Sequence, residues 1–192
     1  MKIDNFNRIE TFLKKDDPEY FYDVQILRRG KDHPELPAAN WCVKSICIHG
    51  KESLIKHIDE IVKLCETFGA RAYISLMRRS NRKCIENAVK CFAERLYNGD
   101  NKKPEAIWWH AVGTTIPEEK IWVVDIDIKQ WCDVQKVKNY IESKAPNKKI
   151  IGVIPTINGY HIICHPFNCS TFNQDLEIDA EIKKHGLTLL YA

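Results

Sequence analysis

The sequence predicts an α/β (α+β) fold for this chain of 192 residues. Residues 43–97 alternate between short β-branched runs and long stretches with apolar residues at helical spacing. Beyond residue 100, two further apolar runs flank a third helical stretch. We expect one compact domain with two parts, an N-terminal α/β unit over residues 1–100 and a second half over residues 101–192.

The elements follow from local patterns, taken in chain order. The first half is predicted to contain a helix over 7–15, strands over 20–28 and 43–49 separated by a loop over 30–40, a helix over 53–68 capped by Gly69, a strand over 70–77 and a helix over 81–97. After a polar linker over 98–104, the second half is predicted to contain strands over 107–110 and 122–128, a helix over 131–143, strands over 149–154 and around residue 161, and a last strand over 187–191 that closes the sheet.

The composition is that of a soluble globular protein, with 44% hydrophobic residues, 29% charged residues and a net charge of +3. No apolar run approaches the roughly 18 residues of a membrane span, and the N-terminus has no apolar signal core. The eight cysteines include no C-x-x-C pair, so we interpret most of them as small buried side chains in a reducing compartment. We therefore expect a cytoplasmic protein with no membrane partner. Its mild basicity permits nucleic-acid binding without requiring it.

The most informative stretch is the strand predicted over 122–128, with the sequence WVVDIDI. Alternation of side chains turns one wholly apolar face toward the core and leaves Asp125 and Asp127 together on the other face. Their Cα atoms would lie about 6.6 Å apart, so both carboxylates can converge on one hard cation such as Mg²⁺ or Mn²⁺. Acids on a hydrophobic strand are costly unless solvent or metal receives them. The same pattern also fits an exposed strand end with an acidic outer face.

A second informative stretch lies about thirty residues downstream. A strand that runs to Pro155 is followed by a tight Asn-Gly turn at 158–159 and by a second strand that carries His161. The preceding helix makes a βαβ crossover, so strand 149–154 should run parallel to the D-x-D strand, as its neighbour or one strand away. The chain then returns antiparallel, which should bring His161 alongside the two aspartates and onto their face.

Together these residues resemble the archaeo-eukaryotic primase superfamily, the primase–polymerases, over residues 121–192. Asp125-Ile126-Asp127 after an apolar run resembles the first motif of that family, and T-x-x-G-x-H over 156–161 resembles the second. The third motif, an apolar residue followed by an acid, is best matched by Ile178-Asp179. The resemblance implies a sheet of mixed strands, similar to an RNA-recognition motif, in the second half. The segment before residue 121 carries no motif that resembles the family.

The resemblance implies a metal-dependent nucleotidyltransferase. Such an enzyme would use nucleoside triphosphates and a DNA or RNA template during replication of a mobile element or phage, with a helicase or another replication protein as a partner. His161 would contact the phosphates of the incoming nucleotide, Thr156 would add a hydroxyl group, and Gly159 would let the backbone approach closely. The residues assigned to catalysis are Asp125, Asp127, His161 and Asp179, and the three acids would bind Mg²⁺ or Mn²⁺.

A run of cations precedes the helix predicted over 81–97. It consists of Arg78, Arg79, Arg82 and Lys83. Cations at a helix N-terminus are unfavourable because they oppose the helix dipole. The run therefore has two interpretations. Either the run is a solvated basic loop, or it joins the backbone N–H groups of the helix start in binding phosphate. In the second case the run faces the same cleft as the acids.

A cluster of zinc-type ligands consists of His161, Cys164, His165 and Cys169. On a strand, the two histidines face one way and Cys164 faces the other. One tetrahedral site would therefore need a break in the strand, so the spacing does not favour structural Zn²⁺.

Two alternative functions also fit the sequence. A metal-dependent nuclease or phosphotransferase would use the same acids and His161 but would cleave instead of extend. A non-catalytic replication accessory, with the topology of an RNA-recognition motif, would only bind nucleic acid. The three functions differ in their product, which is an extended strand, a shortened strand or an unchanged one.

Overall fold

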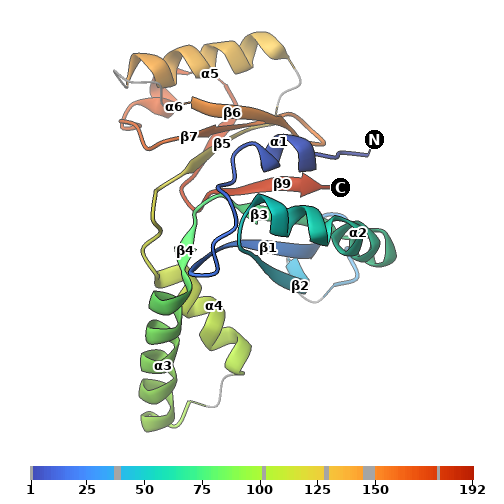
Figure 1. The fold of residues 1–192 in the computed structure, drawn as a ribbon. Helices are drawn as coiled ribbons and strands as arrows, with labels where there is room; N and C mark the ends of the chain where they lie inside the picture. Colours follow the sequence, from blue (N-terminus) through green and yellow to red (C-terminus); the bar gives the residue numbers. More distant parts are fainter. Residues whose placement is uncertain (1, 37–39, 101–102, 128–129, 145–149, 177) are drawn as a thin grey trace.

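The computed structural model describes residues 2–36, 40–100, 103–127, 130–144, 150–176 and 178–192. It confirms the α/β class, because helices pack against sheets of antiparallel strands (Figure 1). The helices are α1 (Phe6–Glu10), α2 (Lys51–Phe68), α3 (Asn81–Tyr97), α4 (Pro104–Thr114), α5 (Trp131–Ser143) and α6 (Phe172–Asp175). The strands are β1 (Tyr20–Arg29), β2 (Asn40–Ile48), β3 (Arg71–Ser75), β4 (Arg79–Ser80), β5 (Trp122–Ile126), β6 (Ile150–Pro155), β7 (Tyr160–Cys164), β8 (Ala180–Lys183) and β9 (Leu187–Tyr191).

Two sheets organise these elements. Sheet 1 has the strand order β2-β1-β3-β9, with β4 paired to β1, and sheet 2 has the order β6-β7-β5-β8. The last strand, β9, therefore belongs to sheet 1, where its Leu187 is paired with Ser75 of β3. The division predicted at residue 100 does not separate the two sheets. The physical reason is that the mostly buried sequence of β9, LTLLY, covers the open edge of β3.

Sheet 2 contains the predicted crossover. β5, α5 and β6 follow one another in the chain, and β7 returns between the two strands. β5 and β6 thus run parallel and lie one strand apart, which is one of the two arrangements that the sequence predicts. Among the described residues, every pair of neighbouring strands is antiparallel, so the expectation of mixed strands is wrong. The hairpin return occupies the position that a parallel neighbour would need.

Most elements have the predicted type, and one does not. The helices expected over 53–68 and 81–97 are α2 and α3, and Gly69 ends α2 with a φ of 56°. The strand expected over 107–110 is instead part of α4. Pro104 fits the first turn of that helix, where its missing N–H costs nothing, and the aromatic run packs against a small buried cluster that overrides its strand propensity. The predicted elements also include residues 37–39, 101–102, 128 and 149, which lie outside the described residues.

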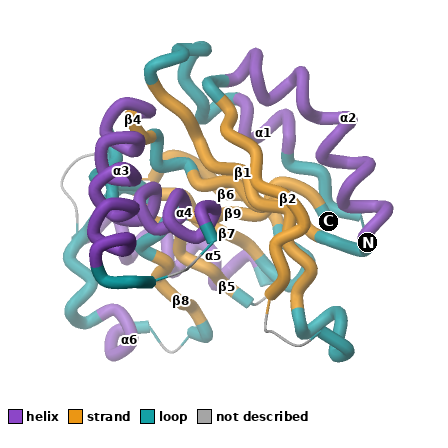
Figure 2. Tube along the Cα trace, turned by 90° about the horizontal axis from the view of Figure 1, so that it is seen from below, coloured by secondary structure: helices purple, strands orange, loops and turns teal. Residues whose placement is uncertain are grey.

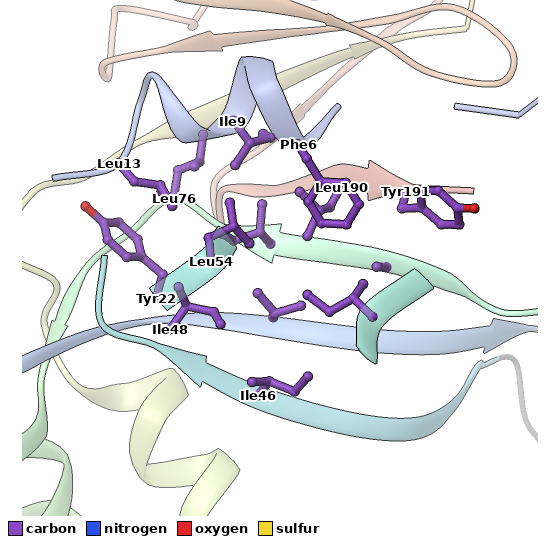
Figure 3. Close-up of a cluster of buried hydrophobic side chains, with 14 of the residues drawn as sticks. Phe6, Ile9, Leu13, Tyr22, Ile46, Ile48, Leu54, Leu76, Leu190 and Tyr191 are labelled. Carbon is purple, nitrogen blue, oxygen red and sulfur yellow. The ribbon is translucent and has the colours of Figure 1, made fainter. Parts of the chain in front are cut away.

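The main core joins the two sheets. α1 lies between them in Figure 1, and its Phe6 and Ile9 lie beside Leu190 of β9 in Figure 3. The same buried cluster includes Val123 of β5 and Ile163 of β7. A continuous apolar core of this kind fixes how the sheets sit relative to each other, because separating them would expose its surface to water.

The predicted apolar face of the D-x-D strand is confirmed. Val124 and Ile126 are fully buried and pack against Val137 and Ile141 of α5, with Trp122 partly buried beside them. Because side chains alternate along a strand, this arrangement turns Val123 and Asp125 toward sheet 1. β5 therefore separates a core on its α5 side from a polar site on the other side.

The helices α3 and α4 form an arm that extends away from the sheets in Figure 1, and the two helices lie side by side in Figure 2. Where the arm meets sheet 1, a third buried cluster contains Phe21, Cys84 and Val112. Next to it lies the buried carboxyl group of Asp23, which accepts a hydrogen bond of 2.6 Å from Gln25. Burial raises the pKa of Asp23 to about 6, although the hydrogen bond from Gln25 and the nearby guanidinium of Arg79 act to lower it.

The first prediction concerns Asn5, which is fully buried between the sheets. Its amide nitrogen donates hydrogen bonds of 3.0 Å to the carbonyl oxygens of Pro155 in sheet 2 and Leu189 in sheet 1. Asn5→Ala leaves both buried acceptors without this donor, so we expect the free energy of unfolding to fall by about 2 kcal/mol in urea denaturation. Asn7→Ala, at an exposed site in α1, is the matched control. Equal stability of the two variants would contradict a stabilising role for the hydrogen bonds from Asn5 to the two sheets.

The second prediction concerns Asp23. A raised native pKa means that the folded protein holds this proton more tightly than the unfolded chain, so the stabilising contribution is present below about pH 4 and is lost as the pH rises through 6. Asp23→Asn should therefore be more stable than the unsubstituted protein at pH 7, by roughly 2–3 kcal/mol, and should lose this advantage toward pH 4. Thermal or urea unfolding across that range measures the effect, with the exposed Asp59→Asn as control. A pH-independent difference would show that Asp23 titrates normally.

Candidate active site

A cleft of about 500 Å³ lies between the two sheets. One wall comes from the face of sheet 1 that α2 does not cover, and includes Leu27, Tyr73 and Leu189. The other wall comes from sheet 2 and includes Asp125 and His161. This volume lies within the range of small-molecule sites in proteins.

Asp125 is the centre of the polar wall. Its Oδ1 lies 3.2 Å from Nε2 of His161, and its Oδ2 accepts a short hydrogen bond from Nζ of Lys183. Burial acts to raise the pKa of this carboxyl group, but the hydrogen bonds and charges of His161 and Lys183 more than offset it and lower the pKa to about 2. The expectation that solvent or metal must receive this acid is thus incomplete, because two side chains of the protein receive it.

His161 lies where connectivity predicts. It is paired with Asp125 across the β5–β7 ladder, and its imidazole points to the same face. The ring is 5% exposed, and its second nitrogen, Nδ1, lies 2.9 Å from the hydroxyl of the fully buried Thr188 in β9. Both ring nitrogens therefore have protein partners, one in each sheet. In this arrangement His161 holds Asp125 in place, whereas the resemblance implies contact with phosphate.

Two further acids line the same wall. Asp127 is exposed at the end of β5, and Glu181 of β8 is paired with Asp125 across the β5–β8 ladder. Paired residues on neighbouring antiparallel strands point to the same face, so Glu181 is on the face of Asp125. Asp179, the predicted third acid, is exposed just before β8 and does not line the cleft. The apolar-plus-acid pattern selected Asp179, whereas the register of β8, which no local pattern shows, selects Glu181.

The cations of the cleft come mostly from sheet 1. Arg29 ends β1, Lys31 follows it, and Arg71 begins β3. Arg71 makes an ion pair of 2.6 Å with Asp32, and Arg29 lies 3.5 Å from the hydroxyl of Tyr73. Sequence reasoning missed these residues because Arg71 is an isolated cation at the start of an ordinary strand, and Arg29 and Lys31 lie in a short R-R-G-K stretch where a strand gives way to a loop.

The basic run at 78–83 does not line this cleft, so the prediction that it faces the acids is wrong. The guanidinium of Arg78 lies 4.7 Å from the ring centroid of Tyr20 and makes loose ion pairs with Asp17 and Glu118. Arg79 is buried and donates a hydrogen bond of 2.9 Å to the carbonyl of Met77. The other two members, Arg82 and Lys83, are exposed at the start of α3. Arg82 makes an ion pair with Glu86.

The turn between β6 and β7 adds neutral groups to the cleft. Thr156, Ile157 and Asn158 line it, while Gly159 is buried and does not. The hydroxyl of Thr156 accepts a hydrogen bond of 3.0 Å from the backbone N–H of Gly159, so it stabilises the turn. Gly159 therefore acts within the turn and is not among the residues that line the cleft.

The zinc-type residues do not share one face. Cys164 is buried with the core under α5, whereas His161 points into the cleft. His165 lies near Glu119, 3.4 Å from its carboxylate. In the described residues, no group of three or more His, Cys, Asp or Glu side chains is arranged to hold a metal ion. For divalent cations, the donor set with suitable chemistry is the three carboxylates on the sheet 2 wall of the cleft, because hard cations prefer oxygen ligands.

No family model, curated protein or solved structure matches this chain. Within the described residues, no helix combines the length and apolar character that a membrane crossing requires. A functional assignment therefore depends on the residues of the cleft themselves.

The third prediction uses the low pKa of Asp125. A depressed native pKa contributes stability above the ordinary pKa of 3.8, and this contribution is lost as the pH falls toward 2. Asp125→Asn should lower the free energy of unfolding at pH 7 by roughly 2 kcal/mol, and the deficit should shrink below pH 4. Urea unfolding from pH 7 to pH 2 provides the measurement, with Asp127→Asn as the exposed control. A deficit that stays constant to pH 2 would contradict the pairing of Asp125 with His161 and Lys183.

Proposed function

We propose that this chain is the core of a metal-dependent nucleotidyltransferase of the primase–polymerase kind. One observation carries the proposal: a single cleft has three carboxylates on the wall from sheet 2 and three cations on the side of sheet 1. Transfer of a nucleotide from a triphosphate needs acids for a divalent cation and positive groups for the phosphates. The resemblance of the D-x-D and T-x-x-G-x-H stretches to two motifs of that family supports the same function.

In this proposal the acids hold the divalent cation. Asp127 directly follows β5, two residues after Asp125, and Glu181 replaces Asp179 as the third acid because it is paired with Asp125 across the sheet. Mg²⁺ or Mn²⁺ bound there would stabilise the attacking and leaving oxygens of the transfer. His161 orients the Asp125 carboxylate through its link to Thr188 and so limits the rotamers that the acid can adopt.

The cations of sheet 1 would receive the phosphates. Arg29, Lys31 and Arg71 line the cleft opposite the acids of sheet 2, and Arg71 also pairs with Asp32 on this side. The guanidinium groups favour bidentate contact with phosphate oxygens, which fixes the orientation of a triphosphate as well as its charge. Tyr73 and Leu189 provide an apolar surface beside them on which a sugar or base can rest.

The fourth prediction is a template-dependent extension assay. The unsubstituted protein, incubated with labelled nucleoside triphosphates, a primed template and Mn²⁺, should lengthen the primer. Asp125→Asn, Asp127→Asn and Glu181→Gln should each lower the rate by roughly 100-fold or more, because each removes a charge from the centre of the reaction. Arg71→Ala should mainly raise the KM for the nucleotide.

The control is the double variant Arg82→Ala/Lys83→Ala, which removes two cations outside the cleft and should extend as well as the unsubstituted protein. A shortened template would favour the nuclease alternative. Binding of nucleic acid with neither extension nor cleavage, at saturating nucleotide and Mn²⁺, would favour the replication accessory and would contradict the proposed function.

A further inference from the structure

The carboxylate of Asp125 already has a cation. Lys183 lies at the end of β8, two residues after Glu181, and its ammonium contacts Oδ2 while His161 contacts Oδ1. Both oxygens of the carboxylate are thus occupied by nitrogen groups. The side chain of Asp125 is 14% exposed to solvent, whereas that of Lys183 is 37% exposed. The Lys183 ammonium that neutralises Asp125 can therefore move away from it into solvent or toward another anion.

A divalent cation and the Lys183 ammonium cannot share Oδ2. Both are positively charged, and two like charges a few ångströms apart repel strongly at a partly buried site. Metal binding to Asp125 therefore requires that Lys183 move, and the loss of this ion pair opposes the binding of metal alone. The long, flexible stem of lysine permits such a movement without rearrangement of the strand.

A triphosphate offers Lys183 another partner. Lys183 lines the same cleft as the cations of sheet 1, so an anion bound there shares one cavity with its ammonium. When the metal takes Asp125 and the phosphates take the ammonium, every charge is again paired. When metal enters alone, the ammonium loses its partner in the protein.

We propose that Lys183 couples the binding of divalent cation and triphosphate in this cleft, by neutralising Asp125 in the free protein and moving to the phosphates when both ligands enter. This inference rests on the proposed function, because it takes the acids as metal ligands. It makes the two ligands bind cooperatively, and by thermodynamic reciprocity each must raise the affinity for the other by the same factor. Lys183 thereby keeps the site from filling with metal when no nucleotide is present.

The fifth prediction tests this coupling with Mn²⁺ alone and with a non-hydrolysable nucleoside triphosphate. Electron paramagnetic resonance of free Mn²⁺ gives the affinity of the protein for the metal. Lys183→Met should bind Mn²⁺ roughly tenfold more tightly than the unsubstituted protein, because no ammonium competes for Oδ2. Calorimetry with the triphosphate analogue should show a smaller gain in affinity on addition of Mn²⁺ than in the unsubstituted protein.

The matched control is Lys184→Met, which removes the same charge from the next residue, whose ammonium lies 5.2 Å from the ring centroid of Trp122 and does not contact Asp125. It should leave both affinities unchanged. On an Asp125→Asn background, Lys183→Met should have no further effect on Mn²⁺ binding, because the competing pair no longer exists. Lys183→Gln, checked by circular dichroism, provides a second variant if the methionine disturbs folding.

The outcomes separate the two proposals. Equal Mn²⁺ affinity in the unsubstituted protein, Lys183→Met and Lys183→Gln would overturn the coupling while leaving the metal site and the proposed function intact. Failure of all variants to bind Mn²⁺ at millimolar concentration, with or without the triphosphate analogue, would overturn both. Tighter Mn²⁺ binding in Lys183→Met, together with an undiminished increase in affinity for the triphosphate analogue on addition of Mn²⁺, would also overturn the coupling. The reason is that the proposal requires the metal affinity and this increase to change together.

Discussion

The hydrogen bonds of His161 are the interaction on which the cleft depends. The ring connects Asp125 of sheet 2 to the hydroxyl of Thr188 in sheet 1, so a single buried side chain sets both the rotamer of the acid and the distance between the walls. Thr188 reaches this position only because β9, which lies in the second half of the sequence, pairs with β3 of sheet 1. Without that return, the imidazole would have a polar partner on one side only, and a buried nitrogen without a partner is costly.

The five side chains of β5 alternate between two faces, so the strand contributes both to a hydrophobic core and to the site. Val124 and Ile126 are buried against α5, while Val123 joins the core between the sheets and Asp125 opens into the cleft. The fully buried neighbours of Asp125 hold its backbone rigidly, and rigid strands position functional groups better than loops do. The same rigidity prevents the strand from turning the acid toward solvent. Its charge must therefore be balanced from within the cleft, which His161 and Lys183 do.

Local pattern was sufficient for most of the predicted elements and for Asp125 and His161 on one wall of the site. The helical spacing of apolar residues located α2 and α3, and strand parity with the hairpin turn placed His161 beside Asp125. Pattern failed where the outcome depends on distant pairing. The register of β8 selects Glu181 over Asp179, and the partner of β9 is a strand more than a hundred residues earlier. A strand that is apolar on both faces does not indicate which sheet it joins.

The contrast between the two sets of cations shows why charge density in a sequence is a poor guide to a site. The run at 78–83 is dense, yet Arg78 packs over an aromatic ring and Arg79 bonds to a backbone carbonyl, so their charges are used within the fold. Arg29 and Lys31 lie in an equally dense stretch, R-R-G-K at 28–31, and Arg71 is isolated in the sequence, yet all three line the cleft that contains the acids. A binding surface needs cations at the cleft, where a ligand can reach them, even if one of them, Arg71, also pairs with Asp32. Tertiary structure decides that availability, because it alone brings β1 and β3 beside β5 and β8.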